Sequence, residues 1–402
     1  MNHRHKDFQS SALPTELPGQ IRYYYDLRFA YKSPAIPLAN PHRQARYYSG
    51  YHLQIQPLVN PRNIILGLLI STLGGALCVW LKTPLPWMIG PLVAMAICNF
   101  SGARLDAPPF GRELGQFLIA VALGLYFTPA VAREVLGHAP VLVAAAIGSI
   151  LIGYVASRVL ARFARIDDAT AFFASVPGGA TEMANLGDRF GAAVDKVAVA
   201  HSLRILMVVC TIPVLMTIAD VHGGDVYRPV LIAFSWGGML QLFAIAATGG
   251  LMLAWVRFPN AWMMGPLIAT IVASASGLEF SSMWGLLTNV GQVLLGCALG
   301  ARFSRHFLSD APRFVAIVLL CIVLMMSLSA AMAWGLASAA GIFLPSMILA
   351  AAPGGIAEMS ITARALQLGV ALVTAAHVTR VLIIVTLSLP AYQLLRRVRT
   401  KK

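Results

Sequence analysis

The chain has 402 residues, of which 58% are hydrophobic and only 11% charged, and its formal net charge is +14. The charged fraction is about half that of a soluble domain, and apolar stretches of roughly 18 or more residues recur from about residue 63 to 395. This pattern excludes a soluble fold and predicts an all-α polytopic membrane protein. The positive residues gather in the N-terminal segment, in short loops and in the basic tail 396–402, which indicates topology determinants and argues against nucleic acid as a partner.

The N-terminal segment, residues 1–60, differs from the rest of the chain. It is rich in Tyr, His, Pro and basic residues, and it contains neither a run long enough to span a membrane nor the apolar core of a signal peptide. We expect a largely disordered, basic cytoplasmic tail. A partner-binding role for this segment, or a start codon chosen too far upstream, stays open.

Beyond the tail, the chain divides into two membrane repeats, residues 61–220 and residues 221–402. Each repeat is predicted to hold six apolar segments, and the fifth is interrupted at its middle by Pro-Gly-Gly. The expected segments are 63–81, 86–100, 113–127, 139–161, 169–187 and 195–218, followed by 229–256, 261–277, 286–301, 313–340, 345–363 and 370–395.

The two repeats share sequence motifs at a nearly constant spacing of 175 or 176 residues. Pro-Trp-Met-x-Gly-Pro-Leu at 86–92 returns at 261–267, where Ala261 replaces the leading proline. Gly-Gln at 115–116 returns at 291–292, and Pro-Gly-Gly-x-x-Glu-Met at 177–183 returns at 353–359. A duplicated membrane segment is the usual ground plan of a secondary transporter.

Loop charges indicate how the repeats are oriented. If each repeat crosses the membrane five times, the second copy is inverted, and most loop arginines lie on one side together with both termini. Six crossings per repeat would place Arg302, Arg305 and Arg313 outside, against the positive-inside bias. We therefore expect two inverted repeats of about five transmembrane helices each. Both termini should be cytoplasmic, with Lys82 on an outer loop and its counterpart Arg257 on an inner one.

The interrupted segments carry the strongest functional signal. A helix broken inside a bilayer leaves backbone groups unpaired, which is tolerated only around a protein-lined or wet cavity. Glu182 and Glu358 fall in the first turn after each break, where a carboxylate can bind a cation or titrate. Each could equally satisfy its own helix start. The predicted ion- or substrate-binding residues here are Pro177, Gly178, Gly179, Glu182, Pro353, Gly354, Gly355 and Glu358.

Two further pairs of polar residues recur in the repeats. His201 and Arg204 match His377 and Arg380, and each pair shares one helix face. They could bind an anion or couple protons at mid-membrane, or each arginine could form a structural ion pair with a nearby Glu. Gln116 and Gln292 could line the site or join helices by hydrogen bonds.

The doubled Pro-Trp-Met-x-Gly-Pro-Leu and Pro-Gly-Gly-x-x-Glu-Met motifs resemble those of the AbrB-duplication family of bacterial inner-membrane proteins. The likeness covers about residues 63–395. Members have carried the labels "AbrB family transcriptional regulator" and "putative ammonia monooxygenase", and the family is similar to the cation:proton antiporter and anion transporter superfamily. The resemblance implies an inverted-repeat transporter fold with broken helices near mid-membrane. It implies no particular substrate.

The residues favour one of these functions over the others. A DNA-binding regulator needs a soluble recognition module, and a copper monooxygenase needs clustered histidines, whereas His201 and His377 lie in separate repeats. The five cysteines are isolated, so neither a disulfide framework nor a zinc site is indicated. We expect a non-enzymatic secondary transporter without a cofactor, in the bacterial inner membrane. Its partners would be the lipid bilayer, an unidentified small solute and a coupling ion, H⁺ or Na⁺. A homodimer and a non-transporting membrane regulator stay open.

Overall fold

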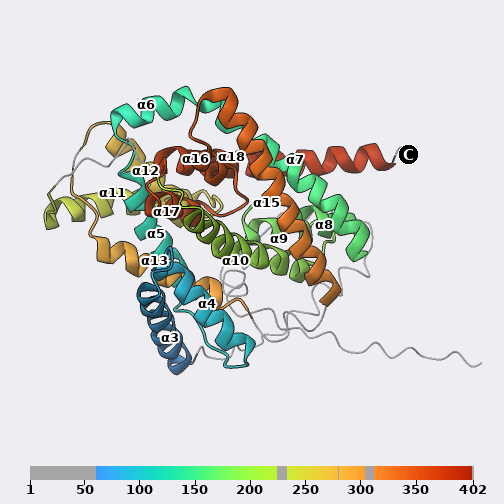
Figure 1. Ribbon diagram of the computed structural model, residues 1–402, viewed down its shortest axis with the longest axis horizontal. Helices are drawn as coiled ribbons and strands as arrows, with labels where there is room; N and C mark the ends of the chain where they lie inside the picture. Colours follow the sequence, from blue (N-terminus) through green and yellow to red (C-terminus); the bar gives the residue numbers. More distant parts are fainter. Residues whose placement is uncertain (1–59, 224–232, 279, 304–311, 401–402) are drawn as a thin grey trace, which may run out of the picture. The chain divides into compact units, whose positions relative to one another are not determined.

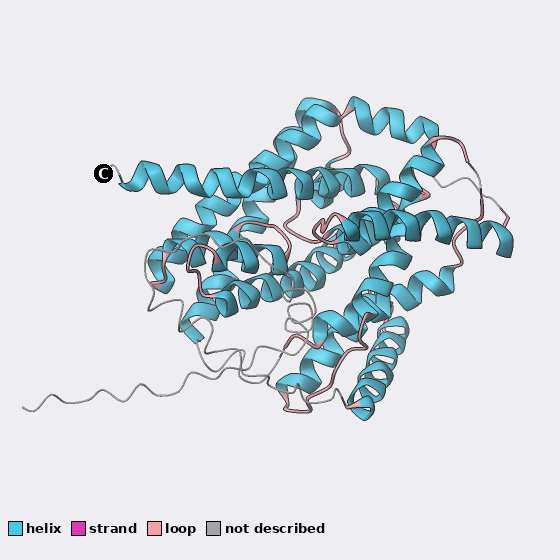
Figure 2. Cartoon of the chain, turned by 180° about the vertical axis from the view of Figure 1, so that it is seen from behind, coloured by secondary structure: helices cyan, strands magenta, loops and turns pink. Residues whose placement is uncertain are grey.

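A computed structural model describes residues 60–223, 233–278, 280–303 and 312–400, with side chains of 394–400 excepted. The segment 1–60, expected to be a disordered tail, lies outside the described residues except for Asn60. Throughout the described ranges every regular element is a helix (Figures 1 and 2), which confirms the all-α prediction.

The helices follow the predicted apolar segments closely, except for a short helix at Pro129–Gly137 that no predicted segment covers; residues 229–232 of the segment 229–256 lie outside the described residues. The first half of the chain forms α3 (Pro61–Trp80), α4 (Pro86–Phe100), α5 (Gly111–Gly124), α6 (Pro129–Gly137), α7 (Ala139–Ala164), α8 (Asp168–Ser175), α9 (Ala180–Asp188) and α10 (Val194–Ile218). The second half forms α11 (Trp236–Trp255), α12 (Ala261–Ala275), α13 (Gly285–Gly300), α15 (Pro312–Ala340), α16 (Leu344–Ala351), α17 (Ile356–Ala365) and α18 (Val370–Thr400).

Local sequence explains where several helices begin. Side-chain oxygens accept hydrogen bonds from backbone N–H groups that the first helical turn leaves unpaired. The residues that cap α3, α6, α8 and α11 in this way are Asn60, Thr128, Asp167 and Ser235. The starts of these four helices are thus fixed by contacts between residues close in sequence.

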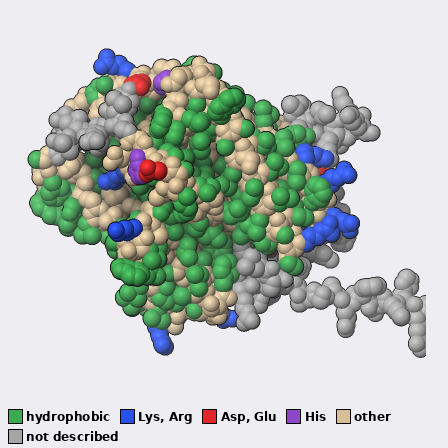
Figure 3. Space-filling model, in the orientation of Figure 1, with side chains coloured by type: hydrophobic (Ala, Val, Ile, Leu, Met, Phe, Trp, Pro, Cys, Tyr) green, Lys and Arg blue, Asp and Glu red, His purple; other side chains and the backbone are tan. Residues whose placement is uncertain are grey.

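Six of the described helices are long and apolar enough to cross a membrane: α3, α7, α10, α11, α15 and α18. They are three corresponding helices from each half of the chain. Many large apolar side chains on them are exposed to the surroundings, and hydrophobic side chains dominate the face drawn in Figure 3. Such exposure would be costly in water but is natural against lipid, so the fold is that of a polytopic membrane protein.

The shorter apolar helices differ from the expected spans. Helices α4, α5, α12 and α13 have 15, 14, 15 and 16 residues. At a rise of 1.5 Å per residue they cover about 21–24 Å, less than the ~30 Å thickness of a hydrocarbon core. Five ordinary spans were predicted in each half, but among the described helices only three in each half are long enough by themselves to cross a membrane. A bent pair, α5 with α6, passes the length test only jointly, with a bend of 93°.

Glycines allow very close helix pairs in both halves. A Cβ added to Gly74 on α3 would lie 2.6 Å from the carbonyl oxygen of Gly90 on α4. In the second half, a Cβ on Gly249 would lie 2.5 Å from the carbonyl oxygen of Gly265. Both contacts join a Gly-Gly pair, at 74–75 or 249–250, to the Trp-Met-x-Gly-Pro-Leu motif. The repeated motif therefore has a packing role, in the manner of small residues at membrane helix interfaces.

Contacts sort most helices into two groups. The first group, which we call the panel, contains α3, α4, α5, α11, α12 and α13, with α4 packed on α13, α12 on α5 and α5 on α13. The second group, the core, contains α7–α10 and α15–α18, with α7 packed on both α15 and α18. Each half of the chain thus contributes equivalent helices to both groups. The contacts between panel and core are sparser, mainly through α17 and α18 against α5 and through α10 against α4.

Candidate functional site

The two Pro-Gly-Gly motifs break helices inside the core group. Residues 176–179 separate α8 from α9, and residues 352–355 separate α16 from α17 (Figure 1). The residue before each proline, Val176 or Ala352, leaves the helical region with ψ of 129° or 143°. Proline disfavours a helical residue before it and lacks an N–H, so the motif itself ends the helix.

A histidine braces the end of the first half-helix in each repeat. The Nε2 atom of His201 lies 2.9 Å from the carbonyl oxygen of Phe173, and that of His377 lies 3.0 Å from the carbonyl oxygen of Leu349. Because a carbonyl only accepts, each histidine donates through Nε2–H. Both side chains are fully buried. Nδ1 of each ring is then an acceptor, and it has no hydrogen-bond partner in the structure.

An arginine one turn further along bridges the break itself. Arg204 donates from Nη1 to the carbonyl of Val176 at 3.3 Å and from Nη2 to that of Gly178 at 3.2 Å. Arg380 donates to the carbonyl of Ala352 at 2.6 Å and also to the carbonyl of Gly354. The planar guanidinium presents two donors in a fixed fork, which matches two carbonyls separated by one residue.

Arg204 and Arg380 thus bind backbone carbonyls and do not form the Glu–Arg ion pair considered from the sequence. Among the described residues the ion pairs are Arg158–Asp168 and His222–Asp220, and neither Arg204 nor Arg380 takes part in one. One hydrogen bond of each arginine goes to the C-cap carbonyl of α8 or α16, at the negative end of the helix dipole, and the other goes to the carbonyl of Gly178 or Gly354 within the break. The His–Arg pairs therefore satisfy the backbone that each break exposes, which is the condition for a broken helix in a membrane.

Glu182 and Glu358 fold back over the starts of α9 and α17. An added Cβ on Gly179 would collide with Glu182 Oε2, and one on Gly355 would collide with Glu358 Oε2. The Glu358 carboxylate also accepts a hydrogen bond from its own backbone N–H. This is the geometry of a residue that caps its own helix start. Glu358 is buried with 8% of its surface exposed, whereas Glu182 is half-buried, so the two sites are not equivalent.

Arginines from the panel group act on both glutamates. Arg302 follows the end of α13 and interacts electrostatically with Glu182, Glu358 and Arg112. Glu358 is likewise influenced by Arg112, near the start of α5. In the sequence, Arg302 counted only as a loop charge and Arg112 was not singled out. Neither is repeated in the other half, where Thr288 and Tyr126 stand, so the repeat pattern carried no signal for them.

Comparison with known proteins identifies the family. Residues 87–396 match the family described as "Transition state regulatory protein AbrB". The chain belongs to the AbrB family. Among its relatives, "Uncharacterized protein YhjN" of Bacillus subtilis is 28% identical over 364 residues, which cover 83% of this chain and 93% of the relative. "Putative regulator AbrB" of Escherichia coli is 26% identical over 321 residues, 79% of this chain and 90% of the relative.

The AbrB-family region contains both breaks and both His–Arg braces, and it leaves out α3 and the N-terminal segment. The family predicted from the motifs is therefore confirmed, as is the membrane character. The assignment of binding roles to individual residues of this AbrB-family chain stays a prediction.

The two glutamines of this AbrB-family protein lie at a helix crossing. Gln116 and Gln292 are both buried. They adjoin Gly115 and Gly291, where α5 and α13 cross: a Cβ on Gly115 would lie 2.7 Å from the carbonyl oxygen of Gly291. The structure thus places the glutamines where panel helices meet, away from the breaks, around which it brings the Glu, His and Arg residues together.

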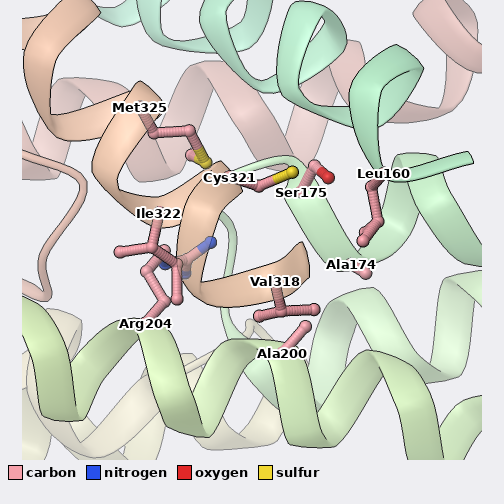
Figure 4. A pocket seen from close by; sticks show the side chains of 9 residues that line it. All are labelled: Leu160, Ala174, Ser175, Ala200, Arg204, Val318, Cys321, Ile322 and Met325. Carbon is pink, nitrogen blue, oxygen red and sulfur yellow. The ribbon is translucent and has the colours of Figure 1, made fainter. Parts of the chain in front are cut away.

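A small cavity adjoins the first break of the AbrB-family region (Figure 4). Arg204 extends toward it from α10, with Cys321 and Met325 opposite on α15 and Ser175 from α8. Its volume is about 10 Å³, close to what one water molecule requires. The Nε atom of Arg204 is buried and unpaired. This cavity can hold a water beside the brace, but not an organic solute.

Proposed function

We propose that the chain is an ion-coupled secondary transporter of the bacterial inner membrane, without enzymatic activity. The observation that carries this proposal is the pair of interrupted helices, each braced by His and Arg within an apolar helical protein. A helical protein with a purely structural or signalling role has no need to break two buried helices at equivalent places. Broken helices with their ends near mid-membrane are the usual site of solute and ion binding in secondary transporters.

Reciprocal contacts support a twofold relation between the two repeats. Helix α4 packs on α13 and its counterpart α12 packs on α5, while α5 and α13 cross each other at equivalent glycines. This exchange is what a twofold relation between the halves produces. The loop charges favour the inverted form of this relation, with both termini in the cytoplasm.

Glu182 and Glu358 would bind or exchange the coupling ion, H⁺ or Na⁺. Both lie at the start of a half-helix, and both interact with the same cation, Arg302. A carboxylate that leaves its helix start to bind Na⁺, or that takes up a proton, would change the charge between panel and core. The sparse contacts between the two groups would allow one to move against the other and so alternate access to the site.

Replacing Glu182 or Glu358 with Gln tests the coupling role. Proteoliposomes of the full chain with a trapped pH-sensitive dye would be given an inward Na⁺ gradient or a pH gradient, with candidate solutes added outside. We expect each variant to lose gradient-dependent flux while it elutes as folded protein. Glu134→Gln, an exposed change on α6, is the matched control. Unchanged flux in both site variants would remove the assigned role.

A second function is favoured by one observation, the name of the Escherichia coli relative, "Putative regulator AbrB". A membrane regulator would pass its signal through the N-terminal tail, residues 1–60. Deleting that tail separates the two functions: a transporter keeps its flux, whereas a tail-dependent regulator loses its effect on gene expression and shows no flux in either form.

A further inference from the structure

Helix α7 carries an exposed apolar stripe along its length. Its residues are Val143, Ile147, Leu151 and Val155, which are between 39% and 60% exposed. Because residues four apart share one face of a helix, they form a continuous surface. The stripe covers ~18 Å, somewhat more than the ~15 Å depth of one leaflet, which is half of a ~30 Å hydrocarbon core. This face of α7 therefore suits contact with lipid tails.

The same face of α7 ends in arginines. Arg158, Arg162 and Arg165 continue the apolar stripe at spacings of three or four residues, and all three are exposed. In Figure 3, Lys and Arg side chains gather at the right-hand edge of the molecule, in the region that α7 and α8 occupy in Figure 1. The helix is thus apolar over the depth of a leaflet and cationic at its C-terminal end. A phospholipid has the complementary profile, with apolar tails below a charged headgroup.

Folding brings a further arginine to this end from another helix. Arg313, in the first turn of α15, donates a hydrogen bond from Nε to the carbonyl oxygen of Phe163 at 3.1 Å. Phe163 directly follows Arg162 in the chain, so this bond places the exposed Arg313 beside the arginines that end α7. Helices α7 and α15 pack along each other. We call the resulting cluster, Arg162, Arg165 and Arg313, the basic patch.

The two aspartates that follow α7 are engaged by other partners. Asp167 caps α8 by accepting hydrogen bonds from the backbone N and from Oγ1 of Thr170, at 2.7 and 2.6 Å. Asp168 forms an ion pair with Arg158 at 3.0 Å. These contacts take up Arg158 and both carboxylates, and they do not include the basic patch. The patch therefore concentrates positive charge where two helices long enough to cross a membrane meet.

We propose that the basic patch binds the headgroup of an anionic phospholipid, such as phosphatidylglycerol, whose tails lie along the apolar stripe of α7. Guanidinium groups present paired N–H donors to a phosphate. Phe163, which is 52% exposed beside the arginines, adds apolar surface at the level of the headgroup. The loop charges predict that this end faces the cytoplasm, where the leaflet is rich in anionic lipid. The proposal concerns the lipid around the protein and does not depend on what the protein transports.

Native mass spectrometry of the purified full-length protein measures lipid binding directly. The probes are phosphatidylglycerol and phosphatidylcholine with the same acyl chains, and sodium phosphate as a source of free phosphate. We expect phosphatidylglycerol to bind more tightly than phosphatidylcholine. Replacing Arg162 and Arg165 together with Gln should weaken its binding about thirtyfold, from about fivefold for each arginine near a membrane surface. Arg62→Gln is the matched control, an exposed arginine at the start of the spanning helix α3 and outside the patch, and should leave binding unchanged.

Several results would overturn the proposal. Equal binding of the two lipids would do so, as would undiminished phosphatidylglycerol binding in the double variant. Displacement of phosphatidylglycerol by free phosphate at similar concentration would indicate an ion site instead of a lipid site. An equal loss in Arg62→Gln would show that net charge alone attracts the lipid, and tighter binding of poly-glutamate would assign the patch to an acidic protein. If the double variant fails to fold, Arg162→Gln alone carries the test, with the fivefold loss expected of one arginine.

Discussion

At the scale of single residues, the His–Arg braces explain how two breaks are tolerated within a membrane domain. Each brace satisfies three backbone carbonyls with one imidazole and one guanidinium, at equivalent positions in the two halves. A buried carbonyl left without a donor costs about 1–3 kcal/mol. The arginines therefore have a structural role. From the sequence alone, a charged residue in an apolar segment is more readily interpreted as a functional residue.

Replacing Arg380 with Lys should lower the free energy of unfolding by about 1–3 kcal/mol. The ammonium group is a compact point charge and cannot reproduce the forked contact to two carbonyls, so one of them loses its donor. The change is measured by denaturant titration of the detergent-solubilised protein. Arg62→Lys on the exposed face of α3 is the control and should stay within about 0.5 kcal/mol. An equally small effect at Arg380 would show that the brace is dispensable.

At the scale of helices, the panel group is organised by close backbone approaches. Gly74 with Gly90, Gly249 with Gly265, and the α5–α13 crossing all place one backbone against another with no room for a side chain. In a bilayer, where helix association gains little from the hydrophobic effect, such contacts supply the packing energy. They hold the helices of the panel tightly together.

Replacing Gly115 with Ala should force α5 and α13 apart. The added methyl group would lie 2.7 Å from the carbonyl oxygen of Gly291, so the backbone must shift, at a cost of about 1–3 kcal/mol. Gly291→Ala should cost less, because its nearest atom is at 3.1 Å. Thermal unfolding ranks the two against Gly237→Ala on α11, which meets nothing within 4 Å. If Gly237→Ala were as harmful as Gly115→Ala, the crossing would not be a tight contact.

At the scale of the whole molecule, the repeats are related by sequence, by element order and by reciprocal contacts. Lys82 and Arg257 occupy the same place in the two halves: each is exposed, directly follows the helix that begins its repeat, and has a positive φ, 52° and 56°. The inverted arrangement predicts that these two residues lie on opposite sides of the membrane, and this prediction is its most direct test.

Single cysteines at these two positions test the inversion. In a protein with its own five cysteines replaced, Lys82→Cys should react with a membrane-impermeant maleimide applied from the periplasmic side. Arg257→Cys should react only after the inner membrane is opened. Labelling of both cysteines from the same side would show that the repeats are parallel. The orientation predicted from the loop charges would then be wrong.

The sequence by itself determined the class of protein, the positions of most helices, the recurring motifs and the two breaks. All of these depend on local properties: apolar run length, proline and glycine chemistry, and motifs that can be aligned. The pairing of side chains required the tertiary structure. Arg204 and Arg380 proved to bind backbone rather than glutamate, because the carbonyls that a break exposes attract a donor only where folding brings the next helix alongside. The electrostatic influence of Arg112 and Arg302 on Glu358 likewise emerged only from the tertiary structure, since unrepeated residues near helix ends look like ordinary loop charges in a sequence.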